Sequence, residues 1–106
     1  MRKLRAWSSG VASVTPIARI DPTWPCCFAG VIQSVRIDPR DRSVEAFIND
    51  GTGCITARWT DRTSFSDLHV TPGMGFIATG LPTVGDKKQL MMNEPSYEVV
   101  PGPQGG

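Results

Sequence analysis

The chain has 106 residues, of which 40% are hydrophobic and 20% charged. This composition is typical of a folded globular protein and excludes global disorder, and the length suffices for one compact core but not for a second domain. The net charge of +1 excludes an extensive basic surface, because proteins that contact many phosphates carry a large excess of Lys and Arg. If the chain binds nucleic acid, we expect a local basic patch and a modest affinity.

The first 25 residues show no sustained hydrophobic period. We expect residues 1–15 to form a mobile arm and residues 16–25 an ordered lead-in, with Ile17 and Ile20 packed against the domain. The basic start of the chain is not followed by the apolar run of a signal peptide, and no segment reaches the roughly 18–20 apolar residues that cross a membrane. The expected location is therefore the cytoplasm.

Residues 26–37 alternate between apolar and other side chains and predict the first strand. The apolar positions change parity between Ile32 and Val35, and this phase change near residues 33–34 predicts a β-bulge. A strand that bends at a bulge can serve two parts of a curled sheet. Residues 38–42, with a proline in second position, indicate the turn that follows.

The strongest short-range signal is Asp50-Gly51-Thr52-Gly53, which stands between alternating runs at residues 43–49 and 54–60. It predicts a hairpin between the second and third strands, because glycine accepts the positive φ of a tight turn. The turn places Asn49 opposite Cys54. The register then gives the other pairs on the outer face, Phe47 with Thr56 and Glu45 with Arg58. Trp59 has the opposite parity and is expected in the core.

The rest of the chain predicts two more strands. Residues 61–72 are polar and allow at most one helical turn. The fourth strand is expected over residues 75–81, and a turn at residues 85–88 leads to the fifth. This fifth strand is expected over residues 89–92 and 97–100 and is interrupted at Pro95, since proline cannot donate to a sheet ladder. Residues 101–106 are expected to form a flexible tail.

Five strands, a bent first strand and a long connection between the third and fourth strands predict an all-β fold. The arrangement expected for residues 26–100 is a five-stranded Greek-key barrel of the OB type, with a short or absent helix between strands three and four. An SH3-like barrel and a small sandwich are alternatives that the strand spacing also allows.

Four segments occur in an order that resembles a known family: Gly30-x-Ile32-x-x-Val35, Phe47-x-Asn49-Asp50-Gly51-Thr52-Gly53-x-Ile55, Pro72-Gly73 and Met92-Asn93-Glu94-Pro95-Ser96-Tyr97-Glu98-Val99-Val100. The resemblance, over about residues 27–100, is to the OB-fold nucleic-acid-binding domains related to the anticodon-binding domains of tRNA synthetases and the wedge domain of branched-DNA helicases. It is closest to small stand-alone OB-fold proteins of actinobacteria. The chain departs from them over residues 60–68, where their basic stretch is replaced by one Arg and two Asp.

OB barrels bind oligonucleotides across the outer face that carries Phe47. An exposed Phe can stack on a base, and a nearby Arg can contact phosphate. The candidate binding residues are therefore Phe47, Thr56, Arg58, Arg36, Arg40, Arg42, Lys87 and Lys88. Alternatives are that the arm or Trp24 covers Phe47, that Arg58 only pairs with Glu45, and that the two lysines form a solvated turn.

No catalytic arrangement, metal site or cofactor site is predicted. The three cysteines match no zinc spacing, and His69, the single histidine, has no recognisable partner. The expected function is weak binding of single-stranded DNA or RNA with little sequence preference, through base stacking and a few phosphates. The alternative is a protein–protein interaction module that uses the barrel edges or the N-terminal arm.

Overall fold

The computed structural model describes residues 14–60, 69–85 and 88–102. This part of the chain is all-β apart from one short 3-10 helix. In chain order its elements are η1 (Ile17–Arg19), β1 (Cys26–Asp38), β2 (Ser43–Asn49), β3 (Cys54–Trp59), β4 (Gly75–Gly80), β5 (Pro82–Val84), β6 (Leu90–Asn93) and β7 (Ser96–Val100). None of the helical structure described is long and apolar enough to cross a membrane.

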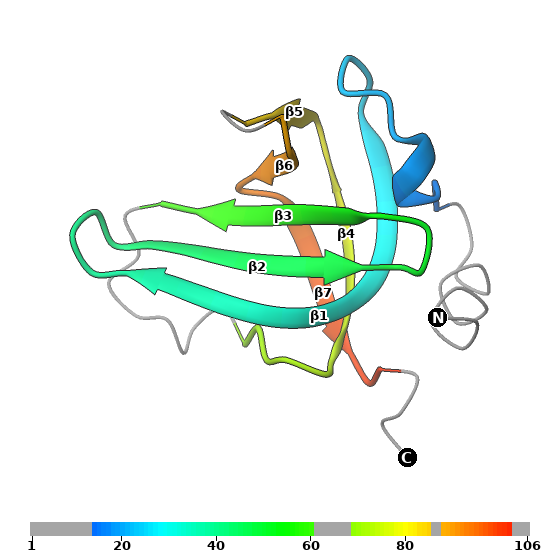
Figure 1. Ribbon diagram of the computed structural model, residues 1–106. Helices are drawn as coiled ribbons and strands as arrows, with labels where there is room; N and C mark the ends of the chain where they lie inside the picture. The colour runs from blue at the N-terminus through cyan, green and yellow to red at the C-terminus, as the bar shows by residue number, and fades with distance from the viewer. Residues whose placement is uncertain (1–13, 61–68, 86–87, 103–106) are drawn as a thin grey trace.

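The strands form a single curled sheet in the order β5-β6-β3-β2-β1-β4-β7. β7 is one edge of this sheet, and β6 is the second strand from the other edge, yet only Glu94 and Pro95 separate the two strands in the chain. The sheet must therefore curl back toward itself. Figure 1 shows the result: β1, β2 and β3 lie side by side, while β4 and β7 cross behind them.

The strand β1 belongs to both parts of the curl. Residues 26–31 pair with β4, and residues 31–38 pair with β2, with a register shift between Ile32 and Ser34. The predicted bulge is thus confirmed, with Gln33 as the extra residue. In Figure 1, β1 sweeps in one continuous arc from its start beside η1 to the turn before β2.

The backbones of β1 and β2 approach very closely at Gly30. A Cβ at this position would lie 2.5 Å from Ile48 Cγ2 and 2.9 Å from the carbonyl oxygen of Asn49. Ile48 is fully buried, so it has little space into which to move. Only glycine allows β1 to pass here while it exchanges one partner strand for the other.

The predicted count of five strands is wrong, because the described residues form seven. The expected fifth strand is two strands: β6 pairs parallel with β3, and β7 pairs antiparallel with β4. The break comes at Glu94, whose φ is 49°. The Glu94 N–H donates to the carbonyl oxygen of Arg58 (2.8 Å), and its carboxylate accepts from the N–H of Thr60 (2.8 Å). The remaining strand, β5, forms a short hairpin with β6.

The core contains the aromatic side chains of four strands. Trp59 is 1% exposed, as predicted, and its ring lies edge-on to Phe76 and Tyr97. The ring of Phe28 adds a further contact with Phe76. The lead-in also packs as predicted, with Ile17 buried in the core and Ile20 against it. The expectations for residues 1–13, 61–68 and 103–106 lie outside the described residues.

Asp50 does more than begin a turn. Its side chain is buried, and its Oδ1 accepts from the N–H of Thr52 (2.8 Å), the Thr52 hydroxyl (2.6 Å) and the N–H of Gly53 (3.1 Å). Its Oδ2 accepts from the N–H of Ile17 (2.9 Å), which opens η1. One carboxylate thus closes the β2–β3 hairpin and attaches the lead-in to it.

Gly30→Ala should lower the free energy of unfolding by about 2 kcal/mol, in the range of overpacking in a filled core. Gly80→Ala is the matched control, because a Cβ there meets mainly the flexible side chain of Met92, at 3.0 Å from its sulfur. Its cost should be less than half as large. Urea denaturation of both variants gives the comparison, and equal stabilities would contradict the close approach of β1 to β2.

Asp50→Asn should lower the free energy of unfolding by about 1–3 kcal/mol, because the new amide nitrogen cannot accept from every N–H that the carboxylate satisfies. Asp21→Asn is the control. Asp21 accepts from the N–H and hydroxyl of Thr23 in an exposed turn, so its replacement should cost well under 1 kcal/mol. Thermal and urea denaturation measure both, and a harmless Asp50→Asn would show that the carboxylate does not hold the lead-in.

Candidate nucleic-acid interface

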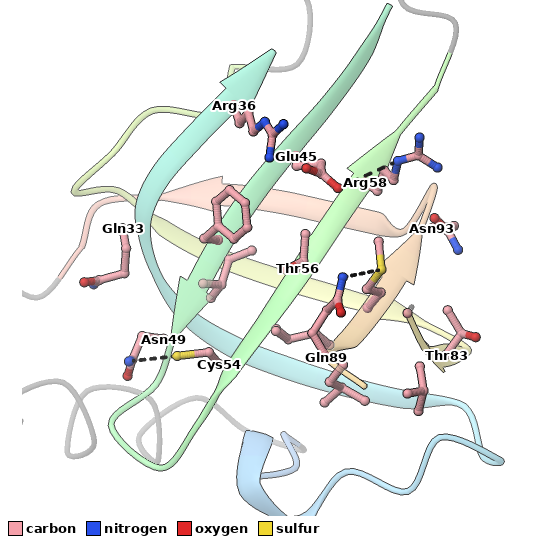
Figure 2. Close-up of a pocket in the computed structure, with 17 residues that line it drawn as sticks. Gln33, Arg36, Glu45, Asn49, Cys54, Thr56, Arg58, Thr83, Gln89 and Asn93 are labelled. Atoms are coloured by element: carbon pink, nitrogen blue, oxygen red, sulfur yellow. Dashed lines mark hydrogen bonds and ion pairs between the residues drawn. The ribbon is translucent and has the colours of Figure 1, made fainter. Parts of the chain in front are cut away.

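A groove with a volume of about 1020 Å³ crosses the outer face of β2 and β3. The end of β1 borders it on one side, and the β5–β6 hairpin borders it on the other. Figure 2 shows its side chains in place, with Thr56 near the centre and Thr83 on the hairpin wall. Four of the predicted binding residues line this groove: Arg36, Phe47, Thr56 and Arg58.

The strand register arranges these side chains in two rows. The first row crosses the sheet as Arg36, Glu45, Arg58 and Asn93, each residue opposite the next on the neighbouring strand. The second row, one pleat away, contains Ser34, Phe47, Thr56, Met91 and Thr83. The predicted hairpin register is therefore confirmed at every pair. The first row is charged apart from Asn93, and the second holds the apolar side chains of Phe47 and Met91 among Ser and Thr residues.

Phe47 lies in the second row and is half-buried. Thr56 beside it is only 7% exposed, and Met91 is 9% exposed, so both belong to the floor of the groove. Trp24, proposed as a cover for Phe47, is 68% exposed and does not line the groove. The arm proposed as the other cover, residues 1–15, lies outside the described part of the chain except for Val14 and Thr15, which do not line the groove.

Arg58 lies between two carboxylates. Its Nη2 is 3.4 Å from Asp41 Oδ2, and its Nε is 3.8 Å from Glu45 Oε2. The predicted alternative of a cross-strand ion pair with Glu45 is thus present, together with a second pair that the hairpin register did not indicate. Hydrogen bonds from Ser43, and more weakly the charge of Arg58, hold the pKa of Asp41 below its ordinary value, so this carboxylate stays ionised.

Arg36 differs from Arg58 although both stand opposite Glu45 in the register. It is exposed, and among the described residues no carboxylate oxygen lies within 4 Å of its guanidinium. In Figure 2 its side chain stands at the same end of the groove as Glu45 and Arg58. Arg36 is therefore the cation of the groove that is most available to a ligand.

Among the described residues, the other predicted basic side chains lie outside the groove lining. Arg40 is in the turn after β1, where Asp38 accepts from its Nε (3.2 Å) and its Nη2 (3.1 Å). These bonds hold the pKa of Asp38 below its ordinary value. Arg42 follows in the same turn with a φ of 56°. Lys88 is exposed between β5 and β6, and Lys87 falls outside the described residues.

The groove also contains residues that the sequence did not indicate. Met91 and Asn93 face it from β6, and Gln89 contacts Met91 through an amide–sulfur bond of 3.6 Å. At the other end lies the predicted pair of Asn49 and Cys54, in which the amide of Asn49 donates to Cys54 Sγ at 3.2 Å; Figure 2 shows this pair beside the hairpin turn. The spacing of Met91 and Asn93, two residues apart, indicates from the sequence that they share one face of a strand. Their place in the groove, however, depends on the parallel pairing of β6 with β3, which is not local.

The sequence matches no protein-family model and no curated protein at a significant level. The fold is similar to that of a solved structure, RecG bound to a three-way DNA junction, with a TM-score of 0.64 and 17% sequence identity. The match covers 87% of this chain and 13% of that chain, so the present chain corresponds to a small part of that protein. At this identity the likeness concerns the fold.

Proposed function

We propose that this protein is a small OB-type module that binds single-stranded DNA or RNA in the groove over β2 and β3, weakly and with little sequence preference. The observation that carries the proposal is the pair of adjacent rows, in which Phe47 stands beside Arg36 and Arg58. The fold likeness to a protein solved with bound DNA supports it.

The two rows offer partners for the two parts of a nucleotide chain, its bases and its phosphates. Aromatic side chains stack on bases of any type, and each stacked base is worth roughly 1–3 kcal/mol. Phosphates need cations, and the groove offers Arg36 and Arg58. Stacking does not distinguish bases by their hydrogen-bonding edges, hence the low sequence preference. Two cations, one of them already paired, give a weak electrostatic contribution.

In this proposal the protein binds nucleic acid without catalysing a reaction and without a cofactor or metal. The proposal also places the protein in the cytoplasm.

Binding of a labelled mixed-sequence 20-mer, as single-stranded DNA and as RNA, should be micromolar at low salt. If two arginines each contact a phosphate, the logarithm of affinity should fall with the logarithm of salt concentration with a slope of roughly −1.4. Fluorescence anisotropy at low and then physiological salt measures this slope. A flat titration at low salt would contradict the proposed function.

Within the groove, Phe47→Ala should weaken binding of this 20-mer by roughly fivefold to a hundredfold, through the loss of one stacked base. The control is Ile37→Ala, which removes a 51% exposed apolar side chain outside the groove and should leave affinity unchanged. Equal effects of Phe47→Ala and Ile37→Ala would place the ligand elsewhere.

Among the cations, Arg36→Ala should reduce the slope of affinity against salt concentration, and Arg40→Ala should not, since Asp38 holds Arg40 outside the groove.

A second candidate function is a protein–protein interaction module. The observation that favours it is the exposure of two large apolar side chains, Trp24 (68%) and Leu81 (60%), just beyond the paired ends Cys26 and Gly80 of β1 and β4. An apolar protein interface depends little on salt, whereas phosphate binding depends strongly on it. The salt titration therefore separates the two candidates.

A further inference from the structure

The carboxylates around Arg58 resemble the ligand that the groove is proposed to bind. A phosphate would present oxygen atoms to the same guanidinium edge that now faces Asp41 Oδ2 at 3.4 Å and Glu45 Oε2 at 3.8 Å. Arginine pairs with carboxylate and phosphate through the same planar set of N–H donors. A ligand phosphate and these two side chains therefore compete for the same donors.

We propose that Asp41 and Glu45 are intramolecular competitors for Arg58, so that a ligand phosphate binds the Nε and Nη2 donors of this arginine only by displacing a carboxylate, and that this exchange sets the weak affinity of the groove. The inference rests on the proposed function and concerns how the same groove is regulated.

The exposure of the three side chains makes the exchange feasible. The side chain of Arg58 is 32% exposed, that of Asp41 is 53% exposed and that of Glu45 is 23% exposed. Ion pairs that are this open to water are weak and break readily. Asp41 keeps a second set of partners when it releases Arg58, since its Oδ1 accepts from the N–H of Ser43 at 2.9 Å.

The position of Glu45 strengthens the argument. It stands in the charged row directly between Arg36 on β1 and Arg58 on β3, and it lines the groove with both. Figure 2 shows its carboxylate between the two arginines, linked to Arg58. Removing its charge frees Arg58 from one competitor and leaves both cations facing the ligand.

The test uses Glu45→Gln and Asp41→Asn, which keep the size of each side chain and remove its charge. Each should raise the affinity for the labelled single-stranded DNA 20-mer at low salt by roughly threefold to tenfold, the effect of one charge a few ångströms away in water. The matched control is Glu98→Gln, which changes the net charge equally on β7, at an exposed position outside the groove. It should change the affinity by less than a factor of two.

Repeating Glu45→Gln and Asp41→Asn in an Arg58→Ala background separates competition from simple repulsion of the ligand. If the carboxylates act by occupying Arg58, their removal should have no effect once Arg58 is gone. An increase that persists in this background, or that equals the effect of Glu98→Gln, would overturn the inference while the wild-type protein still binds. Absence of binding by the wild type and by both carboxylate variants would overturn the proposed function as well.

Discussion

The close approach of β1 to β2 at Gly30 is the constraint on which the rest of the structure depends. It allows one strand to leave β4 and join β2 without interruption, and the bulge at Gln33 then resets which side chains face outward. Because of this shift, Arg36 stands opposite Glu45 and faces the groove, which Gln33 also lines. A regular strand through the same residues would send the alternate side chains to that face.

Two carboxylates make attachments that the hydrogen bonds between the strands do not provide. Asp50 attaches the lead-in to the β2–β3 hairpin, and Glu94 attaches the β6–β7 connection to the end of β3. The second attachment bears directly on the groove, because it lies where β6 runs parallel to β3. The floor of the groove, where Met91 lies beside Thr56, exists only in this arrangement.

The features that the sequence predicts correctly are local ones. The hairpin register follows from the Asp-Gly turn and the alternation around it, and the bulge follows from a change of parity within one strand. The interruption near Pro95 was predicted, but the pairing of β6 with β3 and of β7 with β4 could not be, since it depends on Glu94 bonding to residues about 35 positions earlier. Which basic residues line the groove could not be predicted for a similar reason. Arg36 and Arg40 look alike in the sequence, but only the structure shows that Asp38 holds Arg40 outside the groove.

The most direct test of the central claim is an NMR titration of the ¹⁵N-labelled protein with an unlabelled single-stranded DNA 20-mer at low salt. The account predicts amide shift changes concentrated on β2, β3 and β6, around Phe47, Thr56 and Met91, with little change on β7. Changes confined to the end of the sheet that carries Trp24 and Leu81, or no changes at all, would contradict a nucleic-acid site in the groove.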